Sequence, residues 1–214
     1  MKINDMNDKN IKHHTDKYSK KEILILEAFN KLVQDGNSLN NIRVVDIAKE
    51  AKIGKGTVYE YFSSKEEVIA KSIVYKMQIE FINIVIKTNN GKDFKEKCYI
   101  GFEELIRLMA QKGSFVQLLL SNKEIHEILK CINDGKDDMI EFRNYILQII
   151  EPIIQSGIQE NIINKELDTT YIQSVFVSVC SGISTMIHFT SEEKIDNKEE
   201  LKDISYTMLI KSLS

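Results

Sequence analysis

A short row of cationic, hydroxyl and phenolic side chains between residues 43 and 65 is suited to binding DNA. Lysine and arginine pair with phosphate oxygens, whereas threonine and tyrosine hydroxyls bond to phosphates or to base edges. We expect the groups nearest the base edges to be Lys55 and Thr57, and the others to lie nearer phosphates. The full set of expected DNA contacts is Arg43, Lys55, Gly56, Thr57, Tyr59, Tyr61 and Lys65.

Two short helices and a tight turn are needed to present these side chains together. The first helix ends at a break near Gly54, and the second runs from about Lys55 to Phe62. On the second helix Val58 and Phe62 lie four residues apart and face the core. This spacing predicts a helix-turn-helix whose second helix enters a major groove. The apolar residues at helical spacing on the first helix are Ile47, Ala48 and Ala51.

This segment resembles the N-terminal domain of the TetR family of bacterial repressors, whose motif runs I-A-x-x-A-G-V-S-x-x-T-L-Y-x-Y-F and is followed by S-K-E. The resemblance is specific across about residues 19–69. It implies an all-α protein, with an N-terminal three-helix helix-turn-helix domain and a C-terminal helical domain for ligand binding and dimerisation. The matching residues are Ile47, Ala48, Ala51, Ile53, Thr57, Val58, Tyr59, Tyr61, Phe62, Ser64, Lys65 and Glu66.

Three residues depart from the family pattern. Lys52 stands where the turn usually has glycine, and Gly54 stands where a serine N-cap is usual. Glycine is within a few tenths of a kcal/mol of serine as an N-cap. Lysine is tolerated in the turn if its backbone avoids the left-handed conformation. Arg43 replaces a threonine that often caps the first helix, which weakens the cap but adds a cation beside the phosphates.

The helix after the motif begins with a capping signal. Ser64 and Glu67 have the spacing of a capping box, and Lys65 lies between them in the first turn. A cation there opposes the helix dipole. Pairing with a DNA phosphate would explain a lysine at this position.

Composition and charge fit a regulator with two domains. The 214 residues are 43% hydrophobic, which is enough for one small domain and one larger helical domain. Residues 1–66 carry 12 Lys and Arg against 10 Asp and Glu, whereas the rest carries 17 against 22. Because the basic excess is modest, tight DNA binding requires the doubled contacts of a homodimer.

The domain plan follows from these signals. We expect a disordered polar arm at 1–18, the DNA-binding domain at 19–66, and an effector-binding and dimerisation domain at 67–214. The arm has no signal-peptide character, which indicates a cytoplasmic protein. The cysteines show no zinc or disulfide spacing, and we expect no metal, no cofactor and no catalytic residue. The three cysteines are Cys98, Cys131 and Cys180.

Helices are expected along nearly the whole chain. The first begins at Ser19 in a capping box with Glu22, and later ones span about 65–87, 93–111, 114–132 and 136–160. Pro152 should kink the last of these. Asn161 is expected to end it in a left-handed conformation, and Asp168 to cap the following helix.

Residues 169–191 contain no Asp, Glu, Lys or Arg, which raises the question of a membrane span. We reject a span because serine, threonine and glutamine make the segment too polar. One side of this helix carries bulky apolar residues and another carries small ones, so a buried face and a close helix-helix contact are expected. With a final helix from about Lys198 it would form a four-helix dimer interface, as the TetR resemblance implies. The expected interface residues are Ser174, Ser178, Ser181, Gly182, Thr185, Leu201, Ile204 and Met208.

The middle helices are expected to enclose an effector site. Aromatic residues and methionine on their inward stripes suit a small, mostly apolar compound. An unpaired buried carboxylate among the polar candidates would favour a lipophilic cation. The expected ligand contacts are Phe102, Glu103, Ile106, Met109, Phe115, Leu118, His126, Glu141, Phe142, Tyr145, Gln148 and Phe176.

The sequence therefore predicts a ligand-responsive transcriptional regulator that a small apolar effector releases from a palindromic DNA operator. Repression rather than activation is implied by the family resemblance alone. One alternative is a small helical enzyme or lipid carrier whose N-terminal motif is only structural. Another is a nucleoid-type DNA binder without an effector, which an enclosed cavity would argue against.

Overall fold

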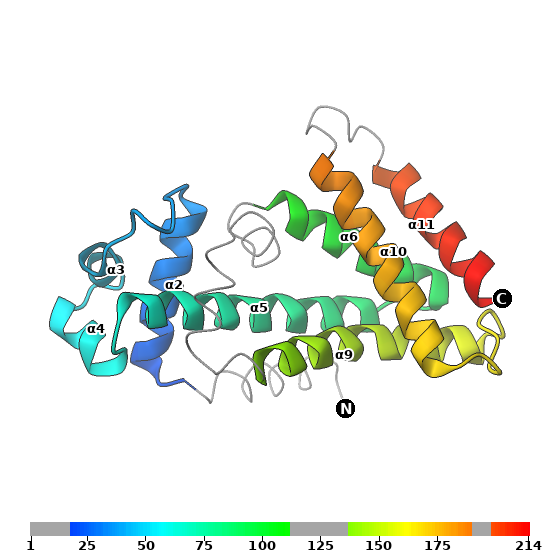
Figure 1. Ribbon diagram of the computed structural model, residues 1–214, viewed down its shortest axis with the longest axis horizontal. Helices are drawn as coiled ribbons and strands as arrows, with labels where there is room; N and C mark the ends of the chain where they lie inside the picture. The colour runs from blue at the N-terminus through cyan, green and yellow to red at the C-terminus, as the bar shows by residue number, and fades with distance from the viewer. Residues whose placement is uncertain (1–17, 112–136, 190–197) are drawn as a thin grey trace. The chain divides into compact units, whose positions relative to one another are not determined.

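The computed structural model describes residues 18–111, 137–189 and 198–214, and its regular elements there are helices (Figure 1). The expected helix at 114–132 and the arm up to residue 17 lie outside these ranges. The described residues divide into two compact units, and the division passes through α5 between Ile82 and Asn83. The sequence placed the domain boundary earlier, between residues 66 and 67.

The helices follow the expected spans to within a few residues. The first unit contains α2 (Lys20–Gln34), α3 (Val44–Glu50), α4 (Lys55–Tyr61) and the start of α5 (Lys65–Asn89). The second unit contains the end of α5, α6 (Phe94–Ala110), most of α9 (Asp137–Gln159), α10 (Thr169–Phe189) and α11 (Lys198–Leu213).

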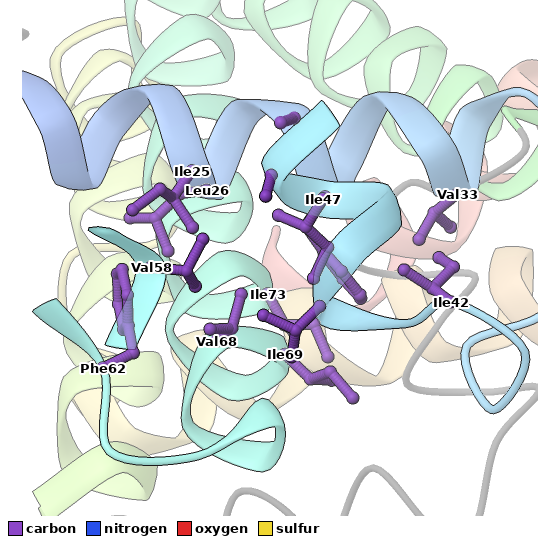
Figure 2. Packing of buried hydrophobic residues seen from close by; sticks show 14 of the residues in the cluster. Ile25, Leu26, Val33, Ile42, Ile47, Val58, Phe62, Val68, Ile69 and Ile73 are labelled. Carbon is purple, nitrogen blue, oxygen red and sulfur yellow. The ribbon is translucent and has the colours of Figure 1, made fainter. Parts of the chain in front are cut away.

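An apolar core holds the helices of the first unit together. Figure 2 shows Ile25 and Leu26 of α2 next to Val58 of α4, and Ile47 of α3 and Ile69 of α5 belong to the same cluster. Ile25, Leu26 and Ile47 are fully buried, as is Phe29. Burying one such side chain contributes roughly 1.5–3 kcal/mol. This core fixes α3 and α4 on α2 and α5.

The start of α2 confirms the expected capping box. The Ser19 N–H donates to Glu22 Oε2 at 2.7 Å, and the Glu22 N–H donates to Ser19 Oγ at 3.3 Å. Tyr18, which the sequence assigned to the arm, is partly buried and packs edge-on against Tyr75, with ring centroids 5.9 Å apart. The packed part of the chain therefore begins at least one residue before the cap.

Among the described residues, α2, α3 and α9 end in left-handed turns. The residues with positive φ are Gly36 at 93°, Lys52 at 57° and Asn161 at 56°. Each follows the last helical turn at the position where glycine or asparagine is common. The expected role of Asn161 is confirmed. The Asp168 cap is also confirmed, because its carboxylate accepts the Thr170 N–H at 2.8 Å.

A second core is built from α6, α9, α10 and α11. Phe94 and Phe176 meet edge-on with ring centroids 6.5 Å apart, and Cys98 is buried beside them. Gly157 on α9 lies so close to Ile163 that a Cβ at position 157 would sit 2.7 Å from the Ile163 side chain. The bulky stripe expected on α10 is the side that enters this core, as Ile183 at 1% exposure illustrates.

By length and composition alone, α10 could cross a membrane. The segment Thr169–Ile187 has a mean hydropathy of 1.3, and 28% of its most apolar window is buried. Core helices of globular proteins have the same composition. The bulky stripe of α10 packs on α6 and α11.

Candidate nucleic-acid interface

Most of the surface of α4 faces outward. Val58 is the buried residue of this helix, and Phe62 at its end points into the same core (Figure 2). Tyr59 is 49% exposed although it is a large aromatic residue. Because one face of the helix packs on the core, its other face can enter the major groove of DNA. The exposed or partly exposed expected contacts on α4 are Lys55, Gly56, Thr57, Tyr59 and Tyr61.

Two tyrosines on this surface each lie near a lysine. Lys55 Nζ is 5.8 Å from the centre of the Tyr59 ring, and Lys21 Nζ is 6.0 Å from that of Tyr61. These cation–π contacts bring ammonium and phenol groups together on the surface. Lys21, from the first turn of α2, was missing from the expected contacts. In the sequence, Lys21 lies in the first turn of a helix that a serine caps, as Lys65 does.

The turn between α3 and α4 carries a strained lysine. The Lys52 N–H donates to the Lys49 carbonyl at 3.2 Å, and the Ile53 N–H donates to the Ala48 carbonyl at 2.9 Å. This pair of bonds requires a left-handed residue at position 52. Lys52 thus takes the left-handed conformation, in which lysine is disfavoured, at a cost of about 1 kcal/mol or more. Gly54 has the extended backbone of an N-cap, as expected.

Arg43 is exposed but not free. Its guanidinium binds the Asp46 carboxylate through two contacts of 2.9 and 3.0 Å, and its own N–H donates to the same carboxylate. Bonds from the Arg43 side chain and N–H lower the pKa of Asp46. Asp46 thereby supplies the cap for α3 that an arginine cannot. A phosphate would have to share Arg43 with Asp46.

The Lys65 ammonium donates to the Asn40 carbonyl at 3.1 Å. The lysine therefore joins the start of α5 to the segment before α3, a structural role that the sequence did not reveal. The capping box around it forms in part. The Glu67 N–H donates to Ser64 Oγ at 3.1 Å, whereas the Glu67 carboxylate accepts from the N–H and hydroxyl of Ser63.

Glu67 is a carboxylate that stays ionised to low pH. Partial burial opposes its ionisation, but bonds from Lys71 and Ser63 outweigh that effect and lower its pKa to about 2. Lys71 Nζ lies 2.6 Å from the carboxylate. The start of α5 is therefore fixed electrostatically, directly after the proposed groove-binding helix.

A helix-turn-helix on an apolar core, with hydroxyl and cationic groups exposed on its second helix, defines a DNA-binding protein. The family model described as "Bacterial regulatory proteins, tetR family" matches residues 38–71, which include α3, α4 and the start of α5. Residues 38–71 therefore carry the DNA-binding motif of TetR-family transcriptional regulators.

Similarity extends over most of the chain. The "Fatty acid metabolism regulator protein" of Bacillus subtilis (strain 168) is 25% identical over 183 residues, which cover 82% of this chain and 87% of that protein. The structure of the fatty acid degradation regulator FadR from Bacillus halodurans has a TM-score of 0.61 and 20% identity, over 90% of this chain and 96% of that one. FadR from Bacillus subtilis in complex with stearoyl-CoA has a TM-score of 0.58 and 21% identity, over 90% and 97%. At these identities the two structures show a shared fold, and these relatives are regulators rather than enzymes.

The expected effector contacts are only partly described. Glu103 is half-exposed and binds Lys202 of α11 at 2.7 Å, and Gln148 is exposed. The side chains of Glu141, Phe142 and Tyr145 are outside the described residues. The same is true of Phe115, Leu118 and His126. The expected contacts that are buried are Phe102, Ile106, Met109 and Phe176.

Glu104, beside the candidate Glu103, is the carboxylate that α6 buries. It is 5% exposed, and its oxygens bind Arg107 of the same helix and Lys87 of α5. A buried carboxylate needs such partners, since an unpaired buried charge is costly. The spacing to Arg107 was visible in the sequence, but the contact with Lys87 depends on how α5 packs on α6.

The expected dimer residues on α10 form an exposed face. Figure 1 shows α10 and α11 side by side. On α11, Ile204 and Met208 are each 51% exposed, and Leu201 is partly buried. Nothing lies within 4 Å of a Cβ built on Gly182. The exposed small residues on α10 are Ser174, Ser178, Ser181, Gly182 and Thr185.

Proposed function

We propose that this regulator is a homodimeric repressor, which binds a palindromic operator through α4 and leaves it when an acyl-chain effector binds the second unit. The observation that carries the DNA role is the exposed polar side of α4, anchored through Val58 and Phe62. In a two-fold dimer the two α4 helices would read half-sites about one DNA turn apart, roughly 34 Å or somewhat more. As a transcriptional regulator the protein would act in the cytoplasm.

A binding-site enrichment experiment tests the DNA role. The wild type is expected to select palindromic sequences from random duplex DNA. Lys55→Ala, Thr57→Ala and Tyr59→Ala should each alter this selection, and Thr57→Ala should relax it without abolishing binding. If all three variants selected the wild-type sequences, α4 would not be the reading helix.

For the effector, a long acyl chain is favoured over a lipophilic cation. The preference for a cation rested on an unpaired buried carboxylate. Glu103 pairs with Lys202, and Glu104 pairs with Lys87 and Arg107, so neither carboxylate needs a cationic ligand. The name of the Bacillus subtilis relative and the stearoyl-CoA in the FadR complex support an acyl-CoA. The buried apolar candidates on α6 and α10 suit an alkyl chain.

Release would follow from a shift between two states of the dimer. Moving the DNA-binding population from 99:1 to 1:99 requires about 10⁴-fold different affinities, about 5.5 kcal/mol. Because α5 contributes residues to both units, we propose that it transmits this difference. The helix around Pro152 is a second place where the two states could differ.

A panel of compounds distinguishes the effector classes. Long-chain acyl-CoA, the matching free fatty acid, free CoA, a neutral aromatic compound and a lipophilic cation would each be tested for DNA release and by calorimetry. We expect release by long-chain acyl-CoA and none by free CoA. Release by the cation alone would restore the cation hypothesis, and no release by any apolar compound would contradict an effector site of this kind.

A further inference from the structure

We propose that Lys52 binds a DNA phosphate beside α4, and that this contact is the reason for a lysine in the left-handed turn. The inference rests on the proposed role of α4 as the groove-binding helix. It concerns position 52, where this chain has lysine in place of the usual glycine.

Two other residues of this chain have the same left-handed conformation as Lys52 and can be compared with it. Gly36 and Asn161 occupy equivalent positions after α2 and α9, and both are residue types that adopt positive φ readily. Lys52 has almost the same φ as Asn161 but carries a long branchless side chain with no local hydrogen bond to favour the turn. Of the three described left-handed positions, the unfavourable one directly precedes the proposed reading helix. A functional reason for the side chain is therefore required.

The ammonium group of Lys52 is available for a ligand. Lys31 and Lys71, on neighbouring helices of the same unit, bind Glu50 and Glu67 respectively. Lys52 is exposed, and its side chain makes no ion pair or hydrogen bond within the described part of the chain. The Lys52 cation therefore stabilises no contact within the described part of the chain.

The place of Lys52 just before α4 puts its ammonium group within reach of the DNA backbone. Lys52 precedes the N-cap Gly54 by two residues and the expected base-edge contact Lys55 by three. A helix in the major groove has a phosphate strand on each side, and most protein–DNA hydrogen bonds go to this backbone. The flexible four-carbon stem of lysine lets its ammonium meet a phosphate from the turn. The contact would strengthen binding without reading sequence.

Lys52→Gly gives the decisive test, because its effects on folding and on binding should have opposite signs. Relief of the strain should raise the melting temperature by about 2–4 °C. Loss of the phosphate contact should weaken operator binding roughly ten-fold at 0.1 M salt, and should reduce the slope of log K against log salt by about 0.9 per half-site. Lys52→Arg, which keeps the cation, should preserve the slope. Asn161→Gly, at a left-handed position of the second unit, should leave binding unchanged.

The outcomes separate this inference from the function on which it rests. If Lys52→Gly bound the operator with wild-type affinity and slope while Lys55→Ala lost selection, the phosphate contact would be wrong and the role of α4 would stand. If the wild type enriched no DNA sequence, the proposed function itself would fail. A Lys52→Gly protein that melted below the wild type would overturn the argument from strain.

Discussion

Side chains around the helix-turn-helix serve the fold and the proposed DNA contact together. Arg43 and Lys65 were expected to face phosphates, yet Arg43 holds Asp46 and Lys65 holds the Asn40 carbonyl. Both cations remain close enough to the surface for a phosphate to compete for them. Substitutions at such residues must therefore be measured on stability and on binding.

Lys65→Ala should show this double role. Loss of the bond to Asn40 should lower the free energy of unfolding by about 0.5–1.5 kcal/mol. Loss of the proposed phosphate contact should weaken binding to specific and non-specific DNA alike, and should flatten the salt dependence by about one unit per half-site. Urea unfolding and salt titrations measure the two effects separately. Reduced stability with an unchanged salt slope would leave Lys65 a purely structural role.

Glu67 should make the stability of the DNA-binding unit depend on acidic pH. Its pKa is about 2 in the folded chain, below the ordinary value of 4.5, so its ionised form favours folding. This stabilisation is present above about pH 4.5 and is lost as the pH falls toward 2. Glu67→Gln should therefore destabilise the protein at pH 7, and the difference from the wild type should shrink between pH 4.5 and 2. A difference independent of pH across that window would contradict the assignment.

The limits of sequence-based prediction are clearest at single positions. The burial of Glu104 rather than Glu103 depends on a cation from another helix, Lys87, which no pattern within α6 contains. The conformation of Lys52 could not be predicted for a different reason. Local propensity disfavours a left-handed lysine, but the hydrogen bonds that end α3 require one.

At the scale of whole helices, prediction succeeded because local chemistry and core packing agree. The capping box at Ser19, the left-handed Asn161 and the cap at Asp168 each mark a helix end that the structure confirms. The apolar stripes gave the buried faces of α6 and α10 for the same reason. What the sequence could not give was the packing partner of each face, since helical periodicity fixes a side and not a neighbour.

Gly157 illustrates a helix position that depends on its neighbours. A Cβ there would lie 2.7 Å from Ile163 and 2.9 Å from Phe94, so Gly157→Ala should destabilise the protein by about 1–3 kcal/mol. Gly101 is the matched control, because its added Cβ would meet atoms at an ordinary 3.8 Å. Gly101→Ala should stabilise by about 0.5–1 kcal/mol through helix propensity. Equal effects of the two substitutions in urea unfolding would show that the close approach at Gly157 is absent.

For the whole molecule, the exposed faces of α10 and α11 predict the assembly. Gly182→Leu or Ser178→Arg would place bulk or charge on the small-residue side of α10, so each should convert dimers into monomers with the DNA-binding unit still folded. Analytical ultracentrifugation measures the change, and circular dichroism checks the helices. A wild type that sediments as a monomer at micromolar concentration would contradict the dimer.

The cysteines of the second unit, buried Cys98 and partly buried Cys180, offer a way to time its opening. Burial raises the pKa of Cys98, and desolvation raises that of Cys180 to about 11, so both are weak nucleophiles near neutral pH. Alkylating reagents should therefore modify Cys98 only when α6 and α10 separate. Mass mapping of alkylated peptides would time that separation in the native protein without an added probe. An effector that binds in the second unit should slow the alkylation of Cys98. The dependence of that rate on effector concentration would give the affinity.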